Sequence, residues 1–409
     1  MKKNYLLFTA FLFFVSQNIF AQIDTSGGRY YQELFTNVTV TSNIAYGSNV
    51  KYNGQTQTLL MDIYEPTGDT VQLRPLIVLA HGGSFIGGTK TDGDVTTLCT
   101  RFAKMGYVTA SIEYRIGMFP IDSVNAIKAV LRATQDMKAA VRWFRQDAAG
   151  ANTYGIHTNY IFIGGSSAGA FMALHHAYMD KVSEFPLGAT TLSSMGGLEG
   201  TSGNPGWSTS ALAVINLCGA LGDSSYLEAG DIPLVSMHGT NDGIVPYGSA
   251  IITIVIFQIM EVDGSASIKA RADNLGILNP FYTFIGADHV PYAGGGAVPA
   301  AYMDTTVWFI RDFLRPFLGI PAPTTVDDNN LDNAFGVFPN PSEGVFHIVI
   351  ENFKINLTGL ITDLSGRTID RFTIGQANYS YSSSLAKGIY LLKISGENNY
   401  SVVKKIVVE

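Results

Sequence analysis

The feature that most constrains the fold of this chain is a short apolar strand, residues 160–163, that runs into the pattern G-x-S-x-G. Gly165 and Gly169 flank Ser167, and an apolar helical segment, residues 170–177, follows at once. A serine on a tight turn between a strand and a helix exposes its hydroxyl at the end of a sheet, where only small neighbours fit. The helix directs free N–H groups and the positive end of its dipole at that position. The pattern predicts that Ser167 is a nucleophile, although a serine there can also simply cap the helix.

Residues 22–318 alternate strands and helices and are expected to form one domain. Continuous apolar runs at 76–80 and 108–112 are typical of strands that are buried on both faces of a sheet. Helical patterns separate these runs from one another and from the strand before the serine. The alternation predicts an α/β fold, in which a mostly parallel sheet has helices on both faces. Residues 251–262 are mostly apolar and fit either a strand or a buried helix.

Two further loops that follow apolar strands carry reactive side chains. Asp242 comes after the run at 233–237, and His289 comes after the run at 281–285. The chain order Ser167, Asp242, His289 is the order that an α/β-hydrolase sheet provides. A serine hydroxyl becomes a good nucleophile when a neutral imidazole takes its proton, and a buried carboxylate orients that imidazole and stabilises its cation. We therefore expect Ser167, Asp242 and His289 to form a catalytic triad.

Other roles are open to these residues and to their neighbours. Asp242 stands in an Asp-Gly turn sequence, and a loop histidine such as His289 is often a packing residue. Asp288 and Asp223 are alternative acids, but Asp288 adjoins His289 and is expected to point elsewhere. We interpret His238 as a structural residue of the turn that presents Asp242. The histidines expected on helix surfaces or in loops are His157, His175 and His176.

The loop at 81–84, with the sequence His-Gly-Gly-Ser, follows the apolar run at 76–80. A tetrahedral intermediate places negative charge on the former carbonyl oxygen, and fixed N–H donors stabilise it there by about 2.7–4 kcal/mol for one donor. The loop offers backbone N–H groups with little side chain around them, and Ala168 offers another beside the nucleophile. A plain glycine turn is the alternative, but the nearby G-x-S-x-G pattern favours an oxyanion hole.

Residues 76–317 resemble an esterase or lipase of the α/β-hydrolase fold, of the kind with an H-G-G-[GS]-[FW] oxyanion loop (the hormone-sensitive-lipase-like and related carboxylesterases). The motifs that carry the resemblance occur in the family's order, at 81–85, 113–115, 165–169, 238–242 and 288–289. The resemblance implies that the oxyanion donors are the backbone N–H groups of Gly83, Ser84 and Ala168, with Ser84 where many relatives have a third glycine. It also implies a serine carboxylic-ester hydrolase that works through an acyl-enzyme, with no cofactor and no metal.

The two ends of the chain differ from its middle. Residues 1–21 join a basic start to a short apolar core, and we expect them to be a secretory signal peptide. Residues 319–333 are rich in Pro, Thr, Asp and Asn, which indicates a linker. Residues 334–409 carry short alternating strands separated by turns, which predicts a small all-β sandwich.

The predicted sandwich resembles the type A sorting domain of the Bacteroidetes type IX secretion system. The resemblance rests on residues 337–341, 363–367, 387–391 and 404–408. It implies passage through the periplasm and export to the cell surface or the medium, with the secretion machinery as a partner. A carbohydrate-binding module is the alternative, but such a module uses an exposed row of aromatic residues, and this segment has no Trp.

The composition argues against two classes of partner. The net charge of -7 offers no basic surface for nucleic acid. No segment after the signal peptide reaches the roughly 18 apolar residues that a membrane helix needs, so we expect no transmembrane segment in the mature protein. The two cysteines, Cys99 and Cys218, can pair in an oxidising compartment or remain separate buried thiols.

The predicted site has no room for a large lid, because only residues 218–232 separate two successive strands where many lipases insert one. We therefore expect an open site that acts on short-chain or small aromatic acyl esters. Polymer-borne esters are the alternative substrates, either acetyl or feruloyl groups on a polysaccharide or a polyester. A non-catalytic binding module on the same fold is the alternative from another class. The aromatic residues expected near the substrate are Phe85, Trp207, Tyr247 and Tyr292.

Overall fold

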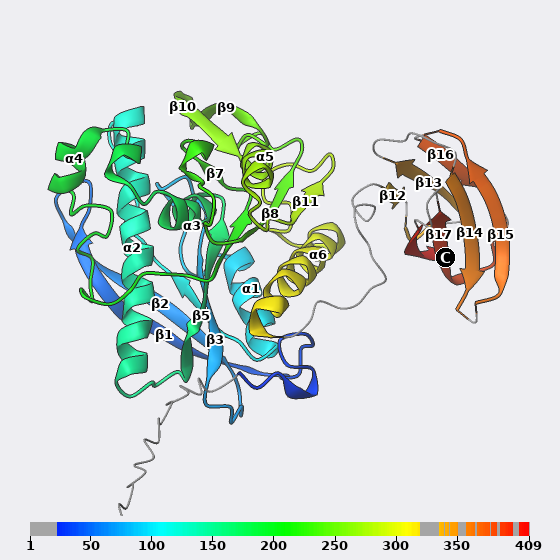
Figure 1. The fold of residues 1–409 in the computed structure, drawn as a ribbon, viewed down its shortest axis with the longest axis horizontal. Coiled ribbons are helices and arrows are strands. Elements are labelled where there is room, and N and C mark those ends of the chain that lie inside the picture. The colour runs from blue at the N-terminus through cyan, green and yellow to red at the C-terminus, as the bar shows by residue number, and fades with distance from the viewer. Residues whose placement is uncertain are drawn as a thin grey trace, which may run out of the picture. The chain divides into compact units, whose positions relative to one another are not determined.

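A computed structural model of the chain describes residues 23–319 and, in the C-terminal part, 335–338, 340–342, 344–350, 357–364, 366–376, 378–382, 385–395 and 401–408. The described residues form two compact units, one that ends at Gly319 and one that begins at Phe335 (Figure 1). The predicted signal peptide lies outside the described residues, and so does the predicted linker apart from Gly319. Among the described residues, no helix combines the length and the apolar character that crossing a membrane requires.

The first unit is built on an eight-stranded sheet with the strand order β1-β2-β4-β3-β5-β6-β8-β11. Strands β1 and β2 are antiparallel, and β2 is antiparallel to β4, whereas β4, β3, β5, β6 and β8 run parallel to their neighbours. The sheet confirms the predicted mostly parallel α/β fold. Its strands are β1 (Val38–Val50), β2 (Thr56–Pro66), β3 (Arg74–Ala80), β4 (Val108–Ile112), β5 (Ile156–Ser166), β6 (Ala213–Leu217), β8 (Leu234–Gly239) and β11 (Phe281–Phe284).

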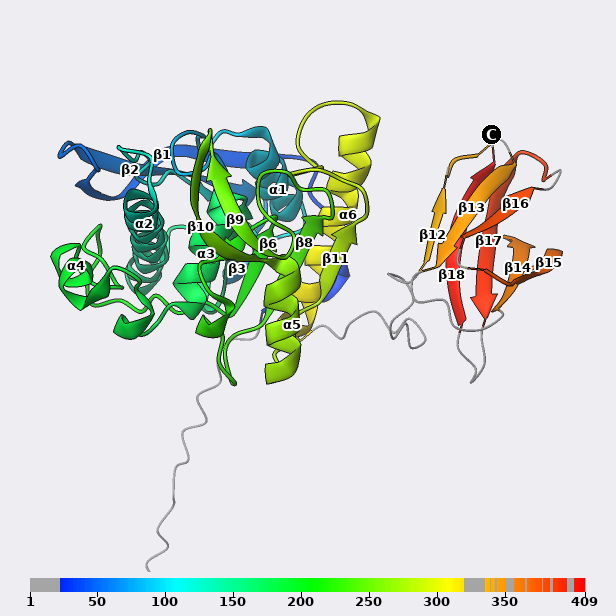
Figure 2. The same cartoon turned by 90° about the horizontal axis from the view of Figure 1, so that it is seen from above.

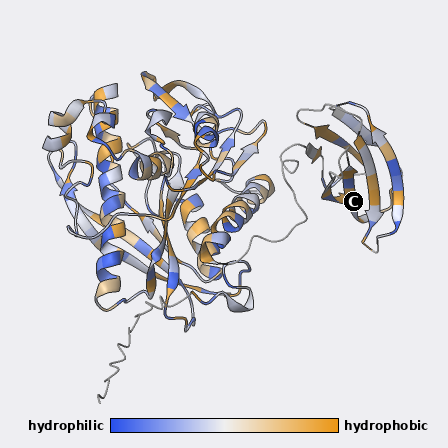
Figure 3. Ribbon diagram, in the orientation of Figure 1, coloured by the Kyte–Doolittle hydropathy of each residue, from blue (hydrophilic) through white to orange (hydrophobic). Residues whose placement is uncertain are grey.

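Helices cover both faces of this sheet. The helices are α1 (Gly93–Lys104), α2 (Ser123–Ala149), α3 (Ala168–Tyr178), α4 (Gly188–Ser194), α5 (Ser265–Leu275) and α6 (Ala297–Leu314). Successive residues of β3 point to opposite faces of the sheet. Leu76 and Val78 belong to the core cluster that includes residues of α2 and α3. Ile77 and Leu79 are also buried but lie outside this cluster, and so do the buried residues of α1 and α6. The helices show hydrophobic and hydrophilic bands in Figure 3, as expected when one face of each is buried.

The segment that the sequence left ambiguous forms a β-hairpin. Strands β9 (Ser249–Ile254) and β10 (Phe257–Gly264) pair antiparallel, and β10 also pairs with the short β7 (Ala220–Leu221). Ile254 and Val262 are buried in the core, whereas Ile256 at the tip is exposed. The apolar residues of this segment therefore face both the core and the solvent, which is why its pattern does not follow a strict strand alternation. The hairpin lies above β7 and α3 in Figure 1, and Figure 2 shows it in the turned view.

The second unit consists of two small antiparallel sheets, with the orders β12-β13-β16 and β15-β14-β17-β18. Its core includes Phe346, Ile348, Leu392 and Ile406, which alternate with exposed residues along their strands. This arrangement confirms the predicted small all-β domain. The strands are β12 (Phe335–Phe338), β13 (Val345–Ile350), β14 (Leu357–Asp363), β15 (Thr368–Ile374), β16 (Asn378–Ser382), β17 (Gly388–Ser395) and β18 (Ser401–Val408).

Candidate active site

Ser167 sits on a sharp turn between β5 and α3, in the left-handed region with φ 54°. Its backbone N–H donates to the carbonyl oxygen of Leu217 at 2.8 Å, which fixes the turn against β6. A Cβ added at Gly165 would lie 2.4 Å from the carbonyl oxygen of Ala80, and one added at Gly169 would lie 2.1 Å from the same oxygen. Both positions therefore require glycine, and the strained turn presents the serine hydroxyl at the end of the sheet.

The structure brings Ser167, His289 and Asp242 together in one chain of hydrogen bonds. His289 Nδ1 lies 2.7 Å from Asp242 Oδ2, and His289 Nε2 lies 2.9 Å from Ser167 Oγ. Because the carboxylate can only accept, Nδ1–H donates to it, and Nε2 is left to accept the Ser167 hydroxyl proton. This is the geometry in which an imidazole can remove the proton of a nucleophilic serine.

The side chain of Asp242 is fully buried, and both of its oxygens accept hydrogen bonds. Oδ1 accepts from the backbone N–H groups of Ile244 and Val245, and Oδ2 accepts from His289 and from His238 Nε2, which is 3.0 Å away. Burial alone would raise the pKa of Asp242, but the hydrogen bonds from His238 and His289 hold that pKa well below its usual range. The carboxylate is therefore ionised. The structure places His238 on Asp242 itself, a contact that goes beyond the turn role expected for it.

The two alternative acids, Asp288 and Asp223, accept hydrogen bonds from backbone N–H groups. Asp288 Oδ1 accepts from the backbone N–H groups of Gly243 and His289, so its carboxylate braces the loops and does not face the imidazole. Asp223 Oδ1 accepts from the backbone N–H of Ser225 at the start of a short 3₁₀ helix, Ser224–Tyr226. Of the three acids considered, Asp242 is the one bonded to the ring of His289.

The His-Gly-Gly-Ser loop packs directly against the nucleophile. A Cβ at Gly82 would lie 3.3 Å from the Cβ of Ser167, and the Tyr114 hydroxyl donates to the carbonyl oxygens of His81 and Gly82. Gly83 and Ser84 both have positive φ, which turns the backbone N–H groups of the loop. Among the described residues, no acceptor occurs for the backbone N–H groups of Gly83, Ser84 and Ala168. Free donors beside a serine hydroxyl are what an oxyanion hole requires.

An apolar pocket of about 820 Å³, counting its open mouth, begins at Ser167. Helices α2 and α3, the β9–β10 hairpin and the segment around Gly222 and Tyr226 form its walls. Its apolar lining includes Phe85, Ile127, Val130, Phe171, Met179, Phe185, Ile254, Ile259 and Val262. A pocket with this lining suits an apolar or aromatic acyl group.

Of the four aromatic residues expected near the substrate, only one lines the pocket. Phe85 lines the pocket. Tyr292 does not, because its buried ring lies behind the serine turn, where its hydroxyl is 2.5 Å from Ser166 Oγ. The ring of Tyr247 packs edge-on to the ring of His238 at 5.7 Å. Trp207 lies partly exposed in the loop between α4 and β6, outside the pocket wall. Sequence proximity to a reactive loop did not distinguish aromatics that face the substrate from those that pack behind it.

The expectation of an open, unlidded site also needs correction. The segment between β6 and β8 is short, as expected, but the β9–β10 hairpin that follows β8 forms part of the pocket wall. The apolar character of residues 251–262 was the signal that could have indicated it. His175 and His176 are likewise not on a helix surface: both are buried, and His175 lines the pocket.

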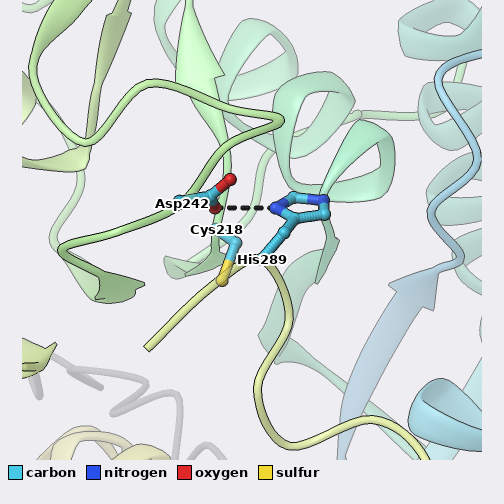
Figure 4. A group of neighbouring side chains, drawn as sticks. All are labelled: Cys218, Asp242 and His289. Atoms are coloured by element: carbon cyan, nitrogen blue, oxygen red, sulfur yellow. Dashed lines mark hydrogen bonds and ion pairs between the residues drawn. The ribbon is translucent and has the colours of Figure 1, made fainter. Parts of the chain in front are cut away.

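Cys218 lies beside Asp242 and His289, with one ligand atom of each residue within 4.8 Å of the others (Figure 4). This set could in principle hold a metal ion. However, burial raises the pKa of the Cys218 thiol to about 12, and Asp242 and His289 are bonded to each other. The geometry therefore favours a triad with a neutral thiol behind it. Cys99 and Cys218 are both buried and unpaired, so they form no disulfide.

Each of the two units is similar to a known protein family. A family model described as BD-FAE matches residues 61–202. The first unit has the α/β-hydrolase fold, and its residues 61–202 are similar to the BD-FAE family of esterases. The BD-FAE match includes the oxyanion loop and Ser167 and ends before Asp242 and His289. A second model, described as a secretion system C-terminal sorting domain, matches residues 336–409. The second unit is the predicted type IX sorting domain, which marks the protein for the cell surface or the medium.

Individual relatives of the first unit have low sequence identity to it. The chain is 33% identical over 116 residues to carboxylesterase 3B of Mus musculus, a match that covers 28% of this chain and only 19% of the mouse protein. Esterase 2 of Thermogutta terrifontis, in a structure phosphorylated by paraoxon, has a TM-score of 0.51 at 22% identity and covers 71% of this chain and 97% of that one. Its propionate-bound structure has a TM-score of 0.50 at 22% identity, covering 70% and 97%. These structural similarities show the fold.

Proposed function

We propose that the first unit hydrolyses carboxylic esters through an acyl-enzyme on Ser167. His289 Nε2 takes the hydroxyl proton as Ser167 Oγ attacks the ester carbon, and the ionised Asp242 stabilises the imidazolium that forms. The N–H groups of Gly83, Ser84 and Ala168 receive the negative charge that develops on the carbonyl oxygen. Collapse of this intermediate expels the alcohol, which takes its proton from His289 Nε2.

Deacylation repeats these steps with water in place of the serine. His289 Nε2 removes a proton from the water as its oxygen attacks the acyl carbon. The same three backbone donors receive the charge on the second tetrahedral intermediate. When it collapses, the acid is released and Ser167 Oγ recovers its proton from His289. The observation that carries this proposal is the unbroken Ser167–His289–Asp242 chain of hydrogen bonds beside three free N–H donors.

For the substrate, we propose acyl groups carried by a polymer, with acetyl and feruloyl esters of a polysaccharide as the first choice. Three observations support this over small soluble esters. The BD-FAE family comprises bifunctional acetyl and feruloyl esterases. The sorting domain marks the enzyme for the cell exterior, where such polymers are met. The apolar pocket behind Ser167 has room for an aromatic acyl group.

The test is release of ferulate and acetate from feruloylated and acetylated xylan, measured beside hydrolysis of p-nitrophenyl acetate. The full-length enzyme is expected to release both acids, and Ser167→Ala is expected to release neither. Asp288→Asn is the matched control, because its carboxylate bonds only to loop backbone. Hydrolysis of the small ester without release from xylan would favour the small-ester alternative. No Ser167-dependent hydrolysis of any ester would favour a non-catalytic binding module.

A further inference from the structure

The apolar pocket follows helix α3 away from the nucleophile. Ala168, Phe171 and His175 line it on one face of the helix, as residues three and four apart do. At a rise of about 1.5 Å per residue, the helix covers about 10 Å from Ala168 to His175. The pocket therefore has a reaction end at Ser167 and a far end, which we define as His175, Gly222 and Tyr226.

Most polar side chains of the pocket are already accounted for. Ser84 and Ser167 lie at the reaction end, and Thr253 is exposed on the hairpin. His175 has no free nitrogen: its Nε2 accepts from the backbone N–H of Gly222, so Nδ1 carries the proton and donates to the carbonyl oxygen of Phe171. Burial lowers the pKa of His175 to about 4, so the ring is neutral at pH 7. It cannot bind a substrate hydroxyl without breaking one of these bonds.

Tyr226 is different, because most of its side chain is buried at the far end while its hydroxyl remains accessible to solvent. No partner for this hydroxyl occurs among the residues that the structure describes. A Cβ at Gly222 would lie 3.6 Å from this hydroxyl and 3.5 Å from His175 Nε2, which places the hydroxyl among the lining groups. Burial, together with the charges of Asp223 and Glu184, raises the pKa of Tyr226 to about 12. The phenol therefore stays neutral and can both donate and accept.

We infer that Tyr226 is a specificity-determining residue, whose hydroxyl hydrogen-bonds the para-hydroxyl of a hydroxycinnamoyl acyl group bound along α3. The inference rests on the proposed function and names the acyl class that the site selects. With bonds of about 1.3–1.5 Å, the para-oxygen of an extended hydroxycinnamoyl group lies about 8 Å from its ester carbon. Together with a hydrogen bond of about 2.8 Å from the para-oxygen, this length matches the distance of about 10 Å that α3 spans between Ala168 and His175. An acetyl group would leave the far end of the pocket unfilled.

The test compares methyl p-coumarate with methyl cinnamate, two esters that differ only in the para-hydroxyl. The full-length enzyme is expected to hydrolyse the coumarate about 10-fold more efficiently in kcat/KM, the worth of one hydrogen bond. In Tyr226→Phe, the ratio of the two kcat/KM values is expected to fall to about one, because the phenylalanine cannot hydrogen-bond the para-hydroxyl. Tyr178→Phe is the matched control, because the Tyr178 hydroxyl donates to the carbonyl oxygen of Ile232 and lies outside the pocket lining.

The outcomes separate this inference from the proposed function. Loss of the coumarate preference in Tyr226→Phe, with retention in Tyr178→Phe, supports the role of Tyr226. Retention of the preference in Tyr226→Phe, or the absence of any preference in the wild type, overturns it while leaving the esterase proposal intact. If the wild type hydrolyses neither ester but Ser167-dependent acetate release persists, the aromatic acyl class is wrong. Binding of p-coumarate to Ser167→Ala and to the double variant with Tyr226→Phe, measured by calorimetry, gives the same comparison without turnover.

Discussion

The hydroxyl of Tyr292 lies 2.5 Å from the hydroxyl of Ser166, the residue immediately before the nucleophile. Ser166 ends β5, and Tyr292 follows His289 in the loop after β11. One hydrogen bond between buried groups therefore joins the loop that holds Ser167 to the loop that holds His289. Such a bond can set the distance between the serine hydroxyl and the imidazole, which is 2.9 Å.

Tyr292→Phe is expected to lower kcat several-fold and to leave KM for a small ester nearly unchanged. The phenylalanine fills the same space, but the loops lose their link, and small misplacements of catalytic groups are costly. Steady-state kinetics on p-nitrophenyl acetate measure both constants. A raised KM with an unchanged kcat would instead mean that Tyr292 contacts the substrate.

His238 is predicted to hold the Asp242 carboxylate in place. Its Nε2 donates to Asp242 Oδ2, while its Nδ1 lies 2.7 Å from the Ser265 hydroxyl. A hydrogen bond to a charged group is worth about 1.5–3 kcal/mol, so His238→Phe is expected to lower kcat roughly 10- to 100-fold. His238→Gln retains an N–H donor and is expected to lose less. Equal kcat values for His238→Phe and the wild type would show that His289 and the backbone N–H groups suffice to orient the carboxylate.

Exchange of the acids distinguishes Asp242 from Asp288. Asp242→Asn should lower kcat by about 10⁴-fold, because an amide cannot hold His289 in the tautomer that accepts the serine proton. Asp288→Asn should lower it less than about 3-fold, because its carboxylate contacts only backbone N–H groups. A reversal of this order in kcat would assign the acid to Asp288.

Much of this site could be predicted from the sequence, for a physical reason. The motif around Ser167 must be glycine-rich because backbone atoms of Ala80 leave no room for a Cβ, so local sequence and local structure determine each other there. The pocket could not be predicted as easily. Phe171 and Tyr226 come from separate segments, and only the packing of those segments against the β9–β10 hairpin makes them neighbours. The sequence could not show that Tyr292 lies outside the pocket for the same reason, since its burial depends on partners that are distant in the chain.

Two buried histidines predict how the stability of the fold depends on pH. Burial lowers the pKa of His175 to about 4 and that of His176 to about 3, from 6.5. Below pH 6.5 these two histidines are protonated in the unfolded chain but remain neutral in the folded chain. Their contribution to the free energy of unfolding is therefore fully present above pH 6.5 and decreases as the pH falls towards 4. The free energy of unfolding from urea denaturation should decrease by a few kcal/mol between pH 7 and 4.5.

His176→Gln should weaken this pH dependence, because it removes one of the two groups that protonate on unfolding. His157→Asn is the control, since His157 is only partly buried. An equally steep dependence in His176→Gln and the wild type would show that other groups dominate acid unfolding.

In the proposed mechanism Ser167 carries the acyl group during turnover, and this acyl-enzyme can be trapped. Full-length enzyme is mixed with p-nitrophenyl acetate, quenched with acid within milliseconds and analysed by intact and peptide mass spectrometry. One acetyl group is expected on the peptide that contains Ser167; it accumulates with the burst of p-nitrophenol and is absent in Ser167→Ala. Acetylation at another residue, or undiminished turnover by Ser167→Ala, would contradict the proposed mechanism.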